Sequence, residues 1–392
     1  MNQKTKFKQT EIGKIPEDWE FKPLNEVVEI NPKRDLKKGT KSKYVSMHDL
    51  KEFNKKIQGF IFRNFNGGSK FQNGDTVMAR ITPCLENGKT AFVDILDEKE
   101  IAAGSTEFIV LSGKEGETIN EFVYYLSRSP KMRADAIASM TGTSGRQRVQ
   151  TDLLGIKEVL VPPISEQQSI ASILSSLDAK IELNKKINQT LESIGQALFK
   201  KWFVDSEYEN EERELGELIG FVKGKKPGEV FDKPLDNTLP QILIDVLDGS
   251  TPKYTLIKDN SVVINTHEVL MVMDGASSGR VEIGFHGILG STLAKIKSID
   301  SIISDYYLYY FLRARQEDIR NNTTGTSIPH ADKGKIKKFA LKIPNKEILV
   351  NFDKMAKQLH EKICINKNEI ERLSKIRDLL LPKLMSGEIR VK

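Results

Sequence analysis

The tetrapeptide TGTS occurs twice, at residues 141–144 within MTGTSGRQRV and at residues 324–327 within NTTGTSIPHA. A four-residue match of small polar residues means little by itself, because such residues are common in loops. The surroundings therefore decide whether the chain contains a repeat.

Flanking segments recur around both copies of TGTS in the same order. The matched pairs are LNEVVEINPKR (24–34) with LGELIGFVKGK (215–225), GSTEFIVL (104–111) with GSTLAKIK (290–297), FVYYLSR (122–128) with YLYYFLR (307–313), and KIELNKKINQTL (180–191) with KICINKNEIERL (362–373). Landmarks spaced roughly 180 to 190 residues apart predict a duplicated module, an internal two-fold pseudo-repeat.

Composition agrees with more than one domain. The chain has 392 residues, 39% of them hydrophobic and 29% charged, and its length exceeds what one core usually organises. No apolar run is long enough to span a bilayer, and the N-terminal segment lacks the apolar stretch of a secretory signal. Cys84 and Cys364 form no disulfide or zinc pattern, so we expect a cytoplasmic protein without a metal site. A net charge of +6 agrees with a polyanionic partner.

Each module has two parts. Short runs such as FIVL and EVLMVM alternate with Gly- and Asn-rich turns, which predicts a mixed α/β globular part. A long segment with three- and four-residue apolar spacing then predicts helices over about 165–203 and 346–385, roughly 55 to 60 Å long.

Three arrangements suit such helices: packing across their own globular part, dimerisation with another chain, or pairing with each other. We expect the last, an antiparallel coiled coil. The expected seam residues are Ile170, Leu177, Ile181, Asn184, Leu191, Leu359, Ile363, Asn366 and Leu373. Asn184 and Asn366 lie near the helix midpoints, where antiparallel pairing lets their amides meet and fix the register. The alternative is that either Asn faces solvent at the edge of the seam.

Two related modules at the ends of a rigid helical pair suit the measurement of distance along duplex DNA, whose turn is about 34 Å. In the first module the candidate DNA-binding residues combine loop hydroxyls for phosphate with arginine forks for guanine. They are Arg80, Thr82, Asn87, Lys89, Thr90, Ser105, Thr106, Thr141, Thr143, Ser144, Arg146 and Arg148. In the second module they are Ser277, Ser278, Arg280, Thr324, Thr326, Ser327, His330 and Lys333. The alternatives are a solvated hairpin at 80–90 and a surface or capping role for His330.

The sequence matches none of the catalytic motifs compared with it. NGKT (87–90) resembles the end of a phosphate-binding loop, but Pro83 stands where that loop needs glycine. Neither GxGxxG nor HExxH occurs. We therefore expect no catalytic residue and no cofactor in this chain.

Four segments together resemble the specificity (S) subunits of type I restriction-modification systems. They are IPEDW (15–19), ARITPCLENGKTAF (79–92), TGTSGRQRV (141–149) and LVPPISEQQSIASIL (160–174). The resemblance covers the whole chain and implies two target-recognition domains, at 1–162 and 205–344, with a central helix at 163–204 and a C-terminal helix at 345–392.

The resemblance also implies a role and partners. The S subunit is non-catalytic and reads a bipartite, asymmetric site on double-stranded DNA. It positions two methyltransferase (M) subunits, which use S-adenosylmethionine to methylate adenine, and endonuclease (R) subunits that need ATP and Mg²⁺. The second module departs from the first, with VMDGASSGRVEIGF (272–285) and IPHADKGK (328–335), so base contacts do not transfer between modules.

A different class of function stays open: an adaptor whose modules bind protein rather than DNA. Docking of partner subunits on the helices is expected from apolar residues off the seam, namely Phe199, Trp202, Phe203 and Leu384. The alternative is that these residues pack against the neighbouring globular domain.

Overall fold

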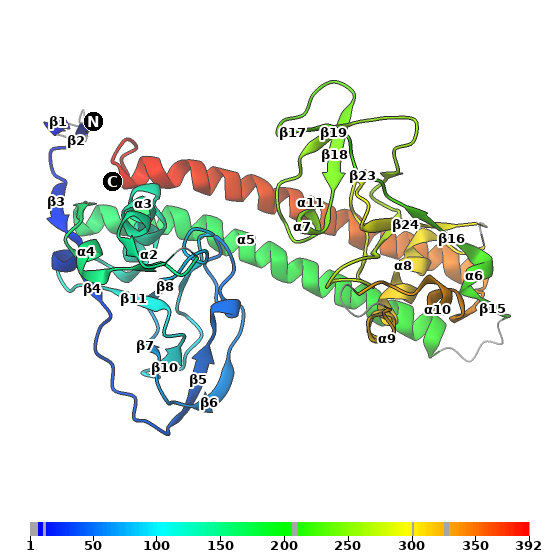
Figure 1. Cartoon of the computed structure of the whole chain (residues 1–392), viewed down its shortest axis with the longest axis horizontal. Coiled ribbons are helices and arrows are strands. Elements are labelled where there is room, and N and C mark those ends of the chain that lie inside the picture. The colour runs from blue at the N-terminus through cyan, green and yellow to red at the C-terminus, as the bar shows by residue number, and fades with distance from the viewer. Residues whose placement is uncertain are drawn as a thin grey trace. The chain divides into compact units, whose positions relative to one another are not determined.

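A computed structural model of the chain describes residues 7–10, 13–143, 145–205, 211–299, 302–324 and 329–391 (Figure 1). Contacts divide the chain into two compact units. Unit 1 comprises Met1–Glu182 and Ile370–Lys392, and unit 2 comprises Leu183–Glu369. Each unit thus holds one globular portion and part of each long helix. The expected limits of recognition domains and helices divide the chain by role instead, and they stay a prediction.

Two four-stranded sheets form the globular portion of unit 1. The first is antiparallel, with the order β4 (Val28–Ile30), β11 (Phe108–Gly113), β8 (Thr76–Ala79) and β9 (Thr90–Phe92). The second has the order β6 (Ile61–Asn64), β5 (Lys41–Val45), β10 (Ala102–Gly104) and β7 (Ser69–Phe71), with β5 and β10 parallel. Three strand pairs complete it: β1 (Phe7–Thr10) with β2 (Gly13–Pro16), β3 (Glu20–Pro23) with β14 (Glu158–Val161), and β12 (Met140–Thr141) with β13 (Arg148–Val149).

Unit 2 repeats this plan. Its antiparallel sheet has the order β16 (Ile219–Lys223), β24 (Leu293–Ser298), β21 (Val269–Val272) and β22 (Val281–Glu282). Its second sheet has the order β17 (Val230–Phe231), β19 (Tyr254–Leu256), β18 (Thr238–Ile242), β23 (Gly287–Leu289) and β20 (Val263–Ile264), with β18 and β23 parallel. β15 (Glu212–Glu214) pairs with β25 (Ala340–Lys342). The predicted duplication is therefore confirmed in the order and direction of the strands.

Short helices follow the same repeat. Those of unit 1 are α1 (Leu24–Val27), a 3₁₀ turn (Met47–Asp49), α2 (Asn120–Arg128), α3 (Pro130–Ala138) and α4 (Thr151–Gly155). Those of unit 2 are α6 (Leu215–Leu218), α7 (Ile244–Leu247), α8 (Asp305–Ala314), α9 (Gln316–Asn321) and α10 (Lys333–Lys337). The aromatic segments FVYYLSR and YLYYFLR form most of α2 and α8, and their side chains are largely buried.

The long helices are α5 (Ile164–Phe199), which continues as a π-helical turn over Lys200–Val204, and α11 (Lys346–Met385). Both match the expected segments, and Pro382 lies in the last turn of α11. Asp178 bonds to Arg377 in unit 1, and Asn188 bonds to Asn366 in unit 2. Residue numbers thus rise along one helix as they fall along the other, which confirms antiparallel pairing.

None of the expected seam residues is classed as exposed. Ile170, Ile181, Asn184, Ile363 and Asn366 are buried, and Leu177, Leu191, Leu359 and Leu373 are half-buried.

The expected hydrogen bond between Asn184 and Asn366 is wrong. Asn184 donates to Glu369 Oε2 at 2.9 Å, while Asn366 donates to Asn188 Oδ1 at 2.8 Å. Both asparagines are only 1% exposed, so the solvent-facing alternative is also wrong. Asn366 lies opposite Asn188, which is about one helical turn beyond Asn184. Each asparagine therefore bonds to a different polar side chain of the opposite helix.

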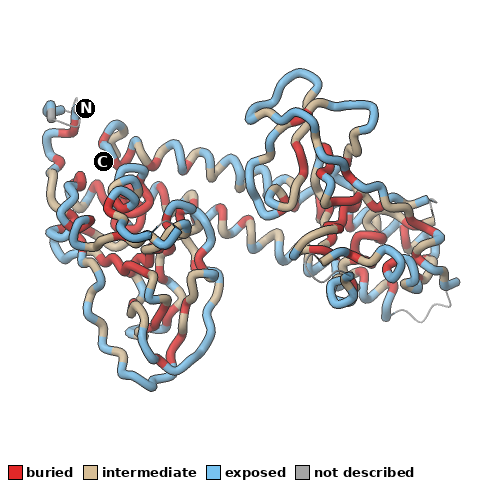
Figure 2. Tube along the Cα trace, in the orientation of Figure 1, coloured by how far each residue is buried: buried red, intermediate tan, exposed pale blue. Residues whose placement is uncertain are grey.

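Each unit has its own buried core (Figure 2). Ile170 and Leu174 of α5 join Leu381 and Leu384 of α11 in the core of unit 1. Phe199 and Phe203 join Phe352 in the core of unit 2.

The proposed docking residues therefore need correction. Phe199, Phe203 and Leu384 are 5% exposed or less, and Trp202 packs against the core of unit 2. They hold the helices to the globular portions and are not a free surface. In the part of the chain that the structure describes, no helix is long and apolar enough to cross a membrane.

A buried histidine in unit 2 gives a prediction. His360 lies on α11, is 5% exposed, and packs against the rings of Tyr306, Tyr309 and Tyr310. Burial, aided by the charge of Lys367, lowers its pKa from 6.5 to about 4. The unfolded chain therefore binds the proton more tightly, and stability that is complete above pH 6.5 is lost as the pH falls towards 4.

We expect the free energy of unfolding to fall by about 2 kcal/mol between pH 7 and pH 5 through this group. His360→Phe should remove that part of the pH dependence, measured by chemical denaturation. His286→Phe is the control, because His286 is exposed. Equal pH slopes for the wild type and His360→Phe would contradict this assignment.

Candidate nucleic-acid interface

Three segments distant in sequence converge beyond the end of β8 in unit 1. The backbone N–H of Arg80 donates to Glu107 O at 2.8 Å, and Val149 N–H donates to Arg80 O at 2.9 Å. Thr82 N–H donates to Gln147 O at 3.1 Å, and Gln147 N–H donates to Thr82 Oγ1 at 3.0 Å. Residues 80–82, 105–107, 141–143 and 145–148 are called the loop junction of unit 1 below.

Two of these backbone bonds recur beyond the end of β21 in unit 2. The backbone N–H of Met273 donates to Thr292 O at 2.8 Å, and Ala331 N–H donates to Met273 O at 2.8 Å. Residues 273–274, 291–292, 324 and 329–331 form the loop junction of unit 2. Ile81 bridges to Arg148 as Asp274 bridges to His330, so Arg148 and His330 occupy equivalent positions.

An ion pair occupies the first of these positions. The Arg148 guanidinium donates to Glu107 through Nε, at 3.0 Å to both carboxylate oxygens, and through Nη2 at 2.7 Å. These hydrogen bonds raise the pKa of Arg148 further. The arginine fork that suits guanine is thus engaged by an acid of the same junction, and it must leave Glu107 before it contacts a base.

The equivalent position in unit 2 has different chemistry. His330 Nδ1 lies 2.8 Å from Asp274 Oδ1, and Lys223 Nζ lies 3.0 Å from Asp274 Oδ2. Burial acts to raise the pKa of the Asp274 carboxyl, but the bonds from His330 and Lys223 outweigh it, and this pKa falls below its usual value. The two junctions therefore share a backbone frame and differ in the side chains that they present.

Arg146 is the uncommitted cation of the first junction. Its side chain is exposed, and among the described residues the guanidinium has no hydrogen-bond or ion-pair partner. Thr106, Thr141 and Thr143 are also exposed, and Thr141 Oγ1 accepts from Gln150 at 2.7 Å. This group offers hydroxyls and one free guanidinium on a single surface.

Other candidates in unit 1 are more constrained. Arg80 Nε donates to Val149 O at 3.1 Å, and Lys89 Nζ donates to Met47 O at 3.1 Å. Ser105 Oγ accepts from Glu107 N–H within its own turn, while Asn87 is exposed in the turn between β8 and β9. Thr90 is 1% exposed in β9, so it presents no side chain at the surface and its assignment is withdrawn.

The candidates of unit 2 divide similarly. Thr324 and Lys333 are exposed, Ser277 is half-buried, and Ser278 is 3% exposed and is withdrawn because of that burial. Ser144, Thr326 and Ser327 lie outside the described residues.

Arg280 forms hydrogen bonds and ion pairs within unit 2. Its guanidinium donates to Glu282 at 2.7 Å, to Asp248 at 2.6 Å and to Leu247 O at 3.0 Å. Burial acts to lower its pKa, but the two carboxylates outweigh it, so the pKa is raised. Each of the three guanidinium nitrogens donates to a partner within unit 2, so Arg280 must leave these partners before it makes a bidentate contact with a base.

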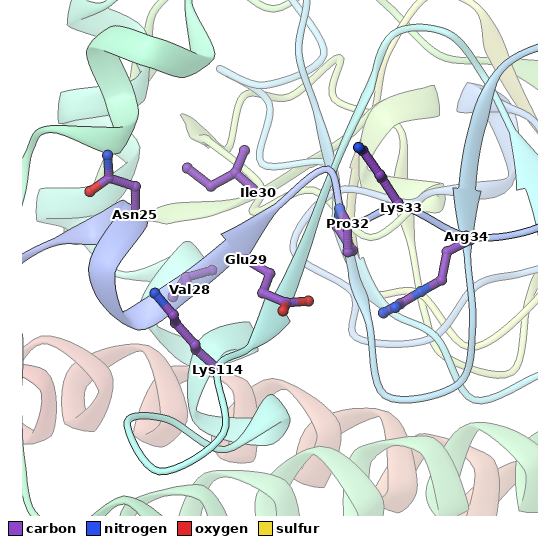
Figure 3. Close-up of a pocket in the computed structure, with 8 residues that line it drawn as sticks. All are labelled: Asn25, Val28, Glu29, Ile30, Pro32, Lys33, Arg34 and Lys114. Atoms are coloured by element: carbon purple, nitrogen blue, oxygen red, sulfur yellow. The ribbon is translucent and has the colours of Figure 1, made fainter.

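A groove in unit 1 that was missed from the sequence is lined by basic side chains and one acid (Figure 3). Lys33 and Arg34 lie at one end, Lys114 lies at the other, and Glu29 lies between them. Arg34 Nη2 donates at 2.9 Å to the fully buried carboxylate of Asp75, immediately before β8. The sequence signal for this groove was the segment INPKR (30–34), which was interpreted only as part of the internal repeat.

Metal chemistry finds no support in the described ranges. Within them, no group of three or more His, Cys, Asp or Glu side chains is arranged to hold a metal ion.

The family model of the type I restriction modification DNA specificity domain matches residues 16–193 and again 207–375. The chain belongs to the type I restriction-modification specificity subunit family. The type I restriction enzyme MjaIX specificity subunit of Methanocaldococcus jannaschii is 27% identical, with 99% of this chain and 97% of that protein covered. The HindI specificity subunit of Haemophilus influenzae is 27% identical, with 81% and 87% covered.

A solved structure of a similar chain supports the fold of this specificity subunit. The type I restriction-modification S subunit from M. genitalium has a TM-score of 0.57 and 18% identity, over 94% of this chain and 96% of that chain. The family resemblance and the two-domain, two-helix architecture predicted from the sequence are both confirmed.

The free and the engaged arginine of the first junction should differ in DNA binding by the assembled complex. Arg146→Ala is expected to weaken binding to the target duplex by about 1 to 3 kcal/mol, as for the loss of a base or charged contact. Arg148→Ala should cost less, because its guanidinium must first give up Glu107. Fluorescence anisotropy at fixed salt measures both, with Arg213→Ala as control. Equal binding by Arg146→Ala and the control would contradict a DNA role for this loop.

Proposed function

We propose that this chain is the non-catalytic DNA-reading subunit of a type I restriction-modification complex. The loop junction of each unit reads one half of a bipartite, asymmetric site on double-stranded DNA. The observation that carries the proposal is the pair of junctions with one backbone frame and different side chains, Arg148 with Glu107 in one and His330 with Asp274 in the other. Equal frames suit equal placement against a duplex, and unequal side chains suit unequal sequences.

Distinct residues take distinct parts in this reading. Arg146 contacts a base edge or phosphate directly, and the exposed Thr106 and Thr143 bind the DNA backbone. Lys33 and Lys114, at the two ends of the groove of unit 1, neutralise phosphates further along the duplex. The functional division is into recognition domains at 1–162 and 205–344, with helical segments at 163–204 and 345–392.

The long helices set the distance between the half-sites and bind two methyltransferase subunits. Exposed apolar residues on their outer faces support docking, namely Leu183, Ile194, Ile365 and Leu379. The methyltransferases carry S-adenosylmethionine and methylate adenine, and endonuclease subunits with ATP and Mg²⁺ complete the complex. No membrane takes part. A protein-binding adaptor is the alternative, and no specific contact in the structure favours it.

Exchange of one recognition domain tests the division of labour. Replacing residues 205–344 with the matching segment of another specificity subunit should change one half of the methylated motif and leave the other half and the spacer intact, because each junction reads independently. Single-molecule methylation mapping of DNA from cells that also express the methyltransferase measures this.

Replacement of 1–162 is the reciprocal control and should change the other half. A change in both halves after either exchange would rule out two independent readers, and unaltered methylation after both would favour the adaptor.

A further inference from the structure

The repeat places two different residue sets at one equivalent position of the helix pair. Aligning Lys180 with Lys362 makes Asp178 of α5 equivalent to His360 of α11. The same alignment makes Gly195 of α5 equivalent to Arg377 of α11. All four residues are buried in the structure. Two of them meet at one crossing in unit 1, where Asp178 bonds to Arg377, and the other two, Gly195 and His360, both lie against Tyr310 at a crossing in unit 2.

The crossing in unit 1 is ionic. Asp178 Oδ1 accepts from Arg377 Nη1 at 2.7 Å, and the two side chains are 5% and 7% exposed. The hydroxyl of Tyr125, on α2, donates to Asp178 Oδ2 at 2.8 Å. Arg377 Nε also donates to Asp378 at 2.9 Å. Both oxygens of the buried carboxylate are therefore satisfied, and the cation that faces it comes from the other helix.

The crossing in unit 2 has no charge pair. Tyr310, equivalent to Tyr125 in the repeat, places its hydroxyl so close to α5 that a Cβ on Gly195 would lie 1.9 Å from it. His360 packs on the Tyr310 ring with centroids 5.6 Å apart. Neither Tyr310 Oη nor His360 Nε2 has a hydrogen-bond partner among the described residues. Here a tyrosine fills the space that Arg377 occupies in unit 1.

These residues distinguish the possible helix pairings. If α5 paired with α5 of a second copy, Asp178 would face Gly195 at both crossings, and each buried carboxylate would lose its cation. If α11 paired with α11, His360 would face Arg377 twice, and each buried guanidinium would lose Asp178 and keep only the exposed Asp378 of its own helix. Breaking a buried ion pair is strongly destabilising, so both like pairings are disfavoured.

We propose that Asp178 and Arg377 make the two long helices select each other. The chain then pairs its own α5 with its own α11 and rejects symmetric pairing with the like helix of a second copy. Selection of this kind is the best attested use of a buried polar group at a helix seam. In a protein that reads an asymmetric DNA site, this selection joins two different recognition domains and not two copies of the same domain.

Charge reversal in the full-length chain tests the proposal. Asp178→Arg leaves arginine at both members of the crossing, and Arg377→Asp leaves an acid at both. Each variant alone opposes pairing within its own chain and gains nothing from a second copy of itself. When the two are co-expressed, α5 of each fits α11 of the other, so two matched crossings form in a reciprocal dimer.

The expected result is a 1:1 complex of the two single variants with about twice the 44.3 kDa mass of one chain, measured by size-exclusion chromatography with light scattering. The double variant Asp178→Arg/Arg377→Asp should return to a monomer. Lys362→Glu, an exposed reversal on α11, is the matched control and should not promote a dimer with either single variant.

Absence of the mixed dimer on co-expression would overturn the proposal, even where a single variant fails to fold alone. A double variant that does not return to a monomer would also overturn it. The measurement involves no DNA, so its failure leaves the proposed DNA-reading function untouched, and failure of that function leaves the pairing result standing.

Discussion

The antiparallel pairing of α5 with α11 is the constraint on which both units depend. Each globular portion completes its core with side chains from both helices: Leu174 and Leu381 in unit 1, Phe199 and Phe352 in unit 2. The first helix follows the first globular portion, and the second helix follows the second. The core of unit 1 therefore includes side chains from chain segments on both sides of unit 2. Arg390 also contacts the first turn of α5, because its Nε donates to Glu166 Oε1 at 2.6 Å. Trp19 Nε1 donates to Oε2 of the same carboxylate at 2.9 Å.

Duplication within this frame separates what is held constant from what varies. The antiparallel sheets have the same strand order in both units, and the aromatic helices α2 and α8 and two backbone bonds of each loop junction correspond. The second sheet of unit 2 has one additional strand, β17. Some side chains at equivalent positions differ, such as Arg148 and His330 at the loop junctions and Asp178 and His360 at the helix seam. A backbone frame sets the position of a loop, while side chains set its chemistry, so a repeated frame with unequal side chains allows two different targets in one protein.

Much of the fold was predictable from the sequence because its signals are periodic or repeated. The segments KIELNKKINQTL and KICINKNEIERL showed both long helices and their equivalence, and TGTS marked the same loop in each module. Apolar spacing on a helix reports burial directly, so the seam residues were found correctly.

Specific partners were not predictable, since they depend on the relative position of elements that are distant in sequence. Asn184 and Asn366 were recognised as buried, but a shift of one turn gave them Glu369 and Asn188 as partners. Arg148 was expected to suit guanine and Arg280 was a candidate DNA-binding residue, yet acids elsewhere in each unit engage both. Phe199 and Phe203 lay off the expected seam, and they are buried against Tyr307 of α8 and Phe352 of α11.

On the proposed function, equivalent loops of the two units read different halves of one DNA site. A photo-reactive amino acid placed at Thr141 in one variant and at Thr324 in another tests it most directly, because these residues are exposed and equivalent in the repeat. Each variant, assembled with methyltransferase and irradiated on the target duplex, should crosslink to one half-site only, and the two variants should mark opposite halves. Crosslinks from both positions to the same half, or crosslinks that ignore the target sequence, would contradict the claim.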